Sequence, residues 1–336
     1  MKPRVLLLRP QETAYSALDQ SAGARLAWRH GLLRDLQLDE DTFDHEEPGA
    51  LERSARRWGE SVSGVVGATN VPQSARLGEL AEEMNVLCFV ANNNPSVWQR
   101  RRHVFHIGLP TAQTADAVAH LLSTARLTRV FLLYDQSEFQ SRVATSMKSA
   151  LEKRDIRVSS CSDTEAGWLE QIAGWNADLV YLVYSAERKA LPLARACKSA
   201  LAGTPLLFGR SLLRKTFIES LGAAAEGALF VDLFRRSGTP SLQENAFMSA
   251  LLVEYGAIAT ANHGFGWDAV MLCGLALSRA EGNVSDGISY LESGVAIDGA
   301  TGAFRFSKEN HNGREGSGPT GISRWHNGQL EEAYYA

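Results

Sequence analysis

Short apolar runs and amphipathic segments alternate along this chain, and the stretch from Arg129 to Leu151 shows the pattern most clearly. The run from Val130 to Asp135 begins almost wholly apolar. It is too short for a helix and is typical of a strand buried on both faces. After a polar loop, Gln136 to Ser141, apolar residues recur at the spacing of one helix face; they are Val143, Met147, Ala150 and Leu151. The pattern predicts a strand–loop–helix unit of a parallel sheet.

The same alternation predicts two arrays of strands and helices, separated by a break at Gly108-Leu109-Pro110. Strands of the first array are expected at Arg4 to Leu8, Val62 to Val66, Val86 to Val90 and His103 to Ile107, with a poor edge strand within Leu36 to Phe43. Strands of the second are expected at Val130 to Asp135, Ile156 to Ser159, Leu179 to Tyr184, Pro205 to Phe208 and Ala228 to Val231. A second break, Ser237 to Pro240, precedes two helices and a tail of short strands with a hairpin turn at Asn327-Gly328.

Alternating strands and helices predict the α/β class, here as two Rossmann-like lobes whose parallel sheets are flanked by helices. The late helices and tail strands must return to one array or the other. Each lobe is therefore expected to be discontinuous in sequence, and the chain to cross between them as a multi-strand hinge. We assign residues 1–109 and about 240–297 to the first lobe, and residues 110–239 and about 298–336 to the second.

Polar or aromatic residues follow many of the predicted strands. They are Tyr15 and Ser16, Thr69 and Asn70, Asn92 and Asn93, Phe139, Tyr184 and Ser185, and Arg210 and Ser211. Ligands of open α/β sheets bind beyond the carboxyl ends of strands. Two lobes whose strand ends face each other would form a cleft that closes on a small ligand. Phe139 is the odd residue, an aromatic on an otherwise polar loop, and a hydrophobe that only caps its own helix is an equal alternative.

Composition excludes several other functions. The chain has 336 residues, 45% of them hydrophobic and 21% charged, with a net charge of −4, as in a globular protein of two domains. The short run Arg100-Arg101-Arg102 is no basic stripe, so no nucleic-acid binding is expected. No apolar run approaches the ~20 residues that cross a bilayer. Val5 to Leu8 is too short for a signal peptide core, which leaves a cytoplasmic protein and one whose leader was removed both open.

Catalytic and metal-binding motifs are not found. The four cysteines are scattered, which disfavours a zinc site, and Cys88, Cys197 and Cys273 lie in apolar patterns typical of buried small hydrophobes. His103 and His106 would point to opposite faces of one strand, which disfavours a metal pair. His263 and Asp268 flank Gly264-Phe265-Gly266, where a helix entry is the simpler interpretation than a catalytic pair. No cofactor, metal or enzymatic activity is predicted.

Four segments resemble a known family in their order and spacing. They are Phe105-His106-Ile107-Gly108 with Ala112-Gln113, Val130 to Ala150, His263 to Val270, and Asp298 to Gly302 followed by Phe304, Phe306 and Ser307. These segments are similar to the type I periplasmic binding proteins, specifically the branched-chain amino acid substrate-binding proteins of ABC importers. The resemblance covers nearly the whole chain and implies two lobes of the periplasmic binding protein type I fold.

The resemblance also implies roles for the candidate residues. Thr69 and Asn70 lie where the family holds a substrate carboxylate at a helix start. Asn92 and Asn93 match a neighbouring polar segment, Phe139 and Tyr184 match family aromatics, and Asn262 and His263 stand at the start of a matching helix.

Arg210 departs from the family pattern. In amino-acid binders an acidic residue near this position holds the ligand's ammonium group, whereas this chain has Gly209-Arg210-Ser211. A cation beside an ammonium is unfavourable, but the guanidinium fork suits a carboxylate. The departure favours a carboxylate or an aromatic acid over a plain branched-chain amino acid.

The leading hypothesis is therefore a monomeric, periplasmic solute-binding protein, which captures a small organic ligand between its lobes and delivers it to the membrane subunits of an ABC transporter. Two alternatives stay open. One is a cytoplasmic ligand sensor of the same fold, and the other is a binder of an apolar, lipid-like ligand, which Phe139 would suit.

Overall fold

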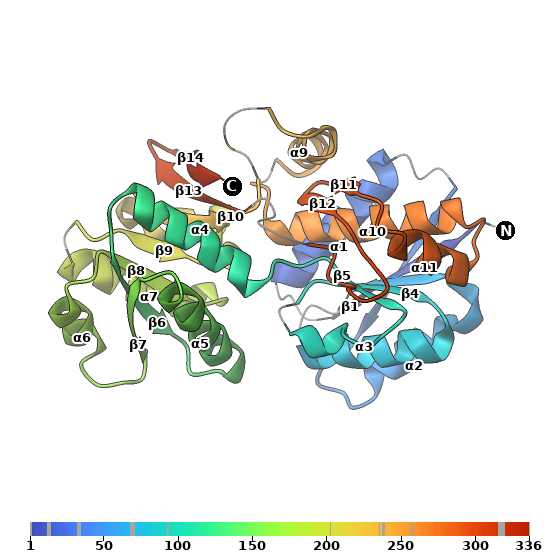
Figure 1. Ribbon diagram of the computed structural model, residues 1–336, viewed down its shortest axis with the longest axis horizontal. Coiled ribbons are helices and arrows are strands. Elements are labelled where there is room, and N and C mark those ends of the chain that lie inside the picture. Colours follow the sequence, from blue (N-terminus) through green and yellow to red (C-terminus); the bar gives the residue numbers. More distant parts are fainter. Residues whose placement is uncertain are drawn as a thin grey trace. The chain divides into compact units, whose positions relative to one another are not determined.

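The structure is a computed structural model that describes residues 2–11, 15–31, 35–67, 71–92, 94–201, 203–234, 236, 239–256, 258–314 and 320–335. The chain divides into two compact units. Unit 1 contains Met1–Leu109 and Pro240–Gly318, and unit 2 contains Pro110–Thr239 and Pro319–Ala336. Each unit is a parallel sheet flanked by helices (Figure 1), which confirms the predicted fold class.

Unit 1 is built on a five-stranded parallel sheet with the order β2-β1-β3-β4-β5. Its strands are β1 (Arg4–Pro10), β2 (Gln37–Phe43), β3 (Gly64–Gly67), β4 (Leu87–Val90) and β5 (Val104–His106). The predicted poor edge strand is β2, which pairs only with β1. The strand order reverses between β1 and β3, so the topological switch point of this sheet lies between their carboxyl ends.

Helices cover both faces of the unit 1 sheet (Figure 1). The helices of this unit are α1 (Tyr15–His30), α2 (Ala50–Trp58), α3 (Val71–Met84), α9 (Leu242–Tyr255), α10 (Ala261–Arg279) and α11 (Val284–Glu292), of which α9 packs against α1 rather than against the sheet. The helices α1 and α10 approach so closely that only glycine fits at the contact. A Cβ on Gly23 would lie 1.8 Å from the carbonyl oxygen of His263, and a Cβ on Gly266 would lie 1.8 Å from that of Gln20.

Residues from 298 to 314 belong to unit 1, not to the second lobe as the sequence suggested. The hairpin of β11 (Ile297–Gly299) and β12 (Gly302–Phe304) is held by Asp268 of α10, whose carboxylate accepts hydrogen bonds from the amide of Ala300 at 2.6 Å and that of Thr301 at 3.0 Å. Arg314 then donates from Nε to the carbonyl of Ile107 at 2.9 Å. A buried carboxylate needs donors, and this hairpin supplies them.

Unit 2 contains a seven-stranded sheet with the order β14-β13-β10-β9-β8-β6-β7. The strands are β6 (Arg129–Tyr134), β7 (Arg157–Ser162), β8 (Leu179–Val183), β9 (Leu206–Phe208), β10 (Leu229–Asp232), β13 (Gly321–His326) and β14 (Gln329–Tyr335). The first five are parallel, and β13 and β14 add an antiparallel edge. The predicted turn at Asn327-Gly328 joins them, with φ values of 49° and 81° that suit a hairpin turn.

The parallel part of the unit 2 sheet repeats the topology of unit 1, because β7-β6-β8-β9-β10 corresponds to β2-β1-β3-β4-β5. Its switch point therefore lies between β6 and β8. The helices of this unit are α4 (Thr111–Thr124), α5 (Glu138–Glu152), α6 (Trp168–Trp175), α7 (Glu187–Ala200) and α8 (Lys215–Leu221). The strands β6 and β8 are buried along almost their whole length, as their apolar sequences predicted.

Candidate functional site

The predicted ligand residues differ in how much the structure describes of them. Thr69, Asn70 and Asn93 lie outside the described residues. Tyr15 and Ser16 are the first two residues of α1, and only their backbone is described. The ligand roles of these five residues stay predictions.

Asn92 follows β4 in unit 1 and is 4% exposed. Its side-chain oxygen accepts a hydrogen bond from the amide of Asn94 at 3.0 Å, and its carbonyl accepts one from Nε2 of His106. The ring of His106 stacks on Trp98 with 3.8 Å between centroids, so this end of β4 is well fixed. The Nδ2 group of Asn92 is nevertheless buried without a hydrogen-bond partner among the described residues.

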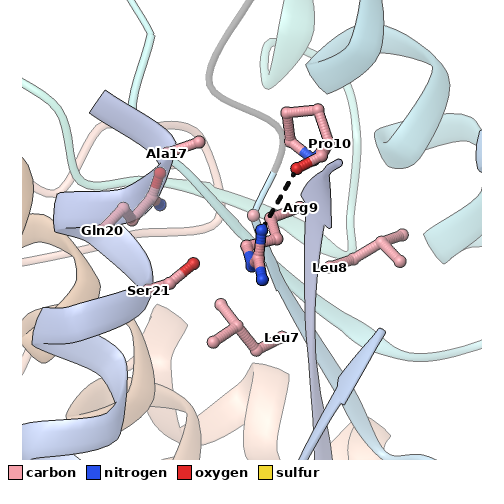
Figure 2. A pocket seen from close by; sticks show the side chains of 8 residues that line it. Leu7, Leu8, Arg9, Pro10, Ala17, Gln20 and Ser21 are labelled. Carbon is pink, nitrogen blue, oxygen red and sulfur yellow. Dashed lines mark hydrogen bonds between the residues drawn. The ribbon is translucent and has the colours of Figure 1, made fainter. Parts of the chain in front are cut away.

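A small cavity of about 10 Å³ lies at the switch point of unit 1. It is lined by Leu7, Leu8, Arg9 and Pro10 of β1, by Gly67 of β3, and by Ala17, Gln20 and Ser21 of α1 (Figure 2). Gln20 and Ser21 were not predicted as site residues. The available signal was two polar residues on the helix face that also carries Ala17 and Ala24, both of which are buried.

Phe139 lies in the first turn of α5, so its placement on a loop was wrong. The helix begins earlier than its apolar pattern indicated because Ser137 caps it, accepting a hydrogen bond from the amide of Gln140 at 3.4 Å. Phe139 is 40% exposed, so its ring does not pack fully against its own helix. An accessible aromatic therefore stands at the carboxyl end of β6.

Tyr184 follows β8 at the switch point of unit 2 and is 2% exposed. Its hydroxyl is buried without a hydrogen-bond partner of normal geometry among the described residues. Burial raises the pKa of Tyr184, and the nearby Asp163 and Asp135 carboxylates raise it further. The phenol is therefore neutral and can donate a hydrogen bond.

Hydrogen bonds between side chains connect the loops around Tyr184. Gln140 donates from Nε2 to the Ser185 hydroxyl at 2.9 Å, which connects the first turn of α5 to the loop after β8. Gln136 donates to the Ser162 hydroxyl at 3.1 Å, at the end of β7. Asp135 accepts from Nζ of Lys189 at 2.6 Å. Burial alone would raise the pKa of Asp135, but its hydrogen bonds to Lys189 and Ser137 outweigh burial and lower that pKa.

Arg210 begins a short 3-10 helix, Arg210–Leu212, directly after β9 and Gly209. Burial lowers the pKa of its guanidinium, an effect that nearby Tyr181 opposes. Ser211 donates to the carbonyl of Tyr184 at 3.3 Å, so the Arg210 segment is tied to the end of β8. The structure thus brings Tyr184, Ser185, Arg210 and Ser211 to the same end of the unit 2 sheet.

His263 connects two helices. Its Nδ1 atom accepts a hydrogen bond from the amide of Thr260 at 3.3 Å in a capping box at the start of α10. The Thr260 hydroxyl in turn donates to Asp19 of α1 at 2.8 Å. His263 and Asp19 are both nearly buried, whereas the neighbouring Asn262 is half-buried. This geometry matches the helix-entry interpretation of His263, and its role toward a ligand stays a prediction.

The described part of the chain shows neither a metal-binding cluster nor a membrane-spanning helix. No group of three or more His, Cys, Asp or Glu residues that could hold a metal ion occurs there. His103 contacts Glu82 and Asn85, whereas His106 contacts Asn92 and Asn312. The two imidazole rings therefore have different hydrogen-bond partners. None of the helices described has the length and apolar character needed to cross a membrane.

Comparison with known proteins gives one family. The model of a family described as periplasmic binding protein matches residues 37–328. A search of curated protein sequences finds no match.

Solved structures share the fold at low sequence identity. A leucine-binding protein from Thermotoga maritima has 18% identity and a TM-score of 0.81, over 98% of this chain and 97% of its own. A solute-binding protein of an ABC transporter from R. palustris, in complex with benzoate, has 18% identity and a TM-score of 0.79, over 100% and 96%. A branched-chain amino acid transporter substrate-binding protein from Streptococcus pneumoniae, in complex with isoleucine, has 17% identity and a TM-score of 0.81, over 100% and 99%.

Proposed function

Because the chain belongs to the periplasmic binding protein family, we propose that it is a solute-binding protein, which captures a small organic ligand and delivers it to the membrane subunits of an ABC transporter. The observation that carries this proposal is a pair of buried polar groups at strand ends, Asn92 Nδ2 in unit 1 and the Tyr184 hydroxyl in unit 2. Among the described residues Asn92 Nδ2 has no hydrogen-bond partner, and the Tyr184 hydroxyl has none of normal geometry, although Asp163 lies near it. Buried polar groups in folded proteins are almost always hydrogen-bonded. Two exceptions at the ligand ends of two sheets are what a protein poised to bind a ligand would have.

The chemistry of these groups favours a ligand rich in hydrogen-bond acceptors. The Asn92 amide nitrogen can only donate, and the neutral phenol of Tyr184 can donate. Arg210 adds a cation at the unit 2 strand ends, where it suits a carboxylate. The exposed ring of Phe139 adds an aromatic surface. We therefore propose a carboxylate, and an aromatic acid more than a plain branched-chain amino acid; the fold also occurs in proteins crystallised with benzoate and with isoleucine.

A thermal-shift panel tests this function. Protein that has been unfolded and refolded, to remove any ligand that co-purifies, is heated with benzoate, 4-hydroxybenzoate, leucine, isoleucine and glutamine in turn. A ligand at ~100 times its dissociation constant should stabilise the protein by about 2.7 kcal/mol. An aromatic acid is expected to give the largest rise in melting temperature. A rise with leucine alone contradicts the acid preference, and no rise with any organic solute contradicts the capture role.

Phe139 favours one second candidate, an apolar ligand. Its ring is 40% exposed and is therefore accessible to an apolar group of a ligand. Native mass spectrometry of protein purified without detergent separates the two candidates. A bound species of lipid mass supports the apolar ligand, whereas a small acid supports the carboxylate.

A further inference from the structure

The cavity at the switch point of unit 1 has a size and lining that select its occupant. Its volume of about 10 Å³ is that of roughly one water-sized sphere. Gln20 and Ser21 are 3% and 1% exposed, and Gln20 Nε2 and Ser21 Oγ are buried with no hydrogen-bond partner among the described residues. Both residues line the cavity (Figure 2). Two buried polar groups beside one small space indicate a site rather than a packing defect.

The two groups do not satisfy each other. Adjacent residues on a helix point in different directions, so Gln20 and Ser21 do not face each other directly. A serine inside a helix commonly bonds the carbonyl four residues earlier, which for Ser21 is that of Ala17. Ser21 Oγ makes no such bond. Across the cavity, Arg9 donates from Nη1 to the carbonyl of Pro10 at 3.5 Å, and so marks the polar rim on the strand side (Figure 2).

We propose that this cavity is a hydration site, in which one water molecule accepts a hydrogen bond from Gln20 Nε2 and pairs with the Ser21 hydroxyl. A cation such as ammonium does not fit, because it can only donate hydrogen bonds and Gln20 Nε2 is itself a donor. An apolar occupant would leave both polar atoms unpaired. Water supplies donors and acceptors at the required size.

The proposed water has a defined place in the fold. It would lie beside the carboxyl ends of β1 and β3, whose residues also line the cavity, at the point where the strand order of the sheet reverses. Gly67 at the end of β3 leaves no space on the strand side, because a Cβ there would lie 1.9 Å from the carbonyl oxygen of Leu8. The site is independent of which ligand the protein carries.

A high-resolution crystal structure of the whole protein tests the site directly. One water peak is expected at about 2.7–3.2 Å from both Gln20 Nε2 and Ser21 Oγ. An empty cavity, density for an organic group, or direct protein partners for both atoms would overturn the proposal.

A stability cycle tests it in solution without any ligand. The urea midpoints of Gln20→Met, Ser21→Ala and the double variant are compared with that of the unchanged protein. If both residues bind one water, the first substitution already weakens the site, so the double variant should shift the midpoint by clearly less than the sum of the single shifts. The control pairs Gln20→Met with Ser289→Ala, an exposed helical serine of the same unit, and should be additive. An equally additive Gln20–Ser21 pair would overturn the proposal, whatever the ligand panel shows.

Discussion

The carboxylate of Asp268 and the polar groups of Asn92 and Tyr184 are all buried, but they differ in their hydrogen bonding. Asp268 accepts hydrogen bonds from two amides of the β11–β12 hairpin and from the Thr301 hydroxyl, and that hydroxyl accepts one from Arg314. Among the described residues, Asn92 and Tyr184 each leave one polar atom without a hydrogen-bond partner of normal geometry. The difference separates the groups that hold the fold from the groups that are available to a ligand.

Unit 2 contains a second satisfied network, around Asp232 at the end of β10. One of its oxygens accepts from the amides of Leu233 and Phe234 at 2.8 and 3.1 Å. The other accepts from Arg236 and from the Ser323 hydroxyl, both at 2.7 Å. Both Asp–Arg networks lie on segments next to positions where the chain leaves its unit. Both of these buried networks, whose polar groups are hydrogen-bonded, therefore stabilise segments next to the points where the chain passes from one unit to the other.

The largest expected effect comes from breaking the Asp268 network at Arg314. Arg314 is 3% exposed, with its guanidinium carbon 4.6 Å from the centroid of the Phe304 ring. Arg314→Met leaves the Asp268 carboxylate buried without a compensating charge, so the free energy of unfolding should fall by about 3–5 kcal/mol at pH 8. Urea unfolding measures it. Arg305→Met, an exposed arginine on the same segment, should change stability by less than ~0.5 kcal/mol. Equal losses in the two variants would contradict the structural role.

The second largest effect is a pH dependence. Burial raises the pKa of Asp268 to about 6, against the opposing hydrogen bonds and Arg314. Since an unfolded Asp titrates near ~3.9, the folded protein binds the extra proton between these values. The stability contribution of Asp268 should therefore fall as pH rises from about 4 through about 6, by roughly 3 kcal/mol in all. The measurement is the difference in unfolding free energy between the unchanged protein and Asp268→Asn across that range. A difference that stays flat would show that Asp268 keeps an ordinary pKa.

The fold could be predicted from the sequence because it depends on local patterns. The apolar run of β6 and the turn at Asn327-Gly328 are recognisable within a few residues. The start of α5 was missed because one capping side chain, Ser137, moves it ahead of the apolar repeat.

The partners of the polar groups could not be predicted, because they lie far away in the sequence. Thr301 is 33 residues from Asp268, and Arg314 is 207 residues from Ile107. Whether Asn92 or Asp268 is satisfied depends on these long-range contacts, which no local pattern encodes. For this reason the sequence placed Asn92 and Tyr184 at strand ends but did not distinguish them from Asp268, and it assigned the Asp268-bound hairpin to the wrong lobe.

The third largest expected effect is on ligand affinity, and Arg210 is the residue that tests it. If Arg210 binds a ligand carboxylate, Arg210→Met should weaken binding of an aromatic acid by about 1.5–3 kcal/mol, the strength of a charged hydrogen bond. Titration calorimetry with the best acid from the thermal-shift panel measures it. Arg157→Met, on an exposed arginine at the amino end of β7, is the matched control and should leave affinity unchanged. An unchanged affinity in Arg210→Met would remove Arg210 from the ligand site.

The smallest expected effect comes from comparing two buried hydroxyls of unit 2. That of Ser323 has a hydrogen-bond partner, and that of Tyr184 has none of normal geometry among the described residues. Ser323 is 1% exposed and donates to Asp232, so Ser323→Ala should lower the free energy of unfolding by about 1.5–3 kcal/mol and leave ligand affinity unchanged. Tyr184→Phe removes a hydroxyl that has no hydrogen-bond partner of normal geometry among the described residues, so it should change stability by less than ~0.5 kcal/mol and weaken ligand binding by about 0.5–1.5 kcal/mol. Urea unfolding and calorimetry on both variants measure the two pairs of values. If Tyr184→Phe destabilised the protein as much as Ser323→Ala and left binding intact, the Tyr184 hydroxyl would belong to the fold, and the distinction between satisfied and available groups would fail at its central residue.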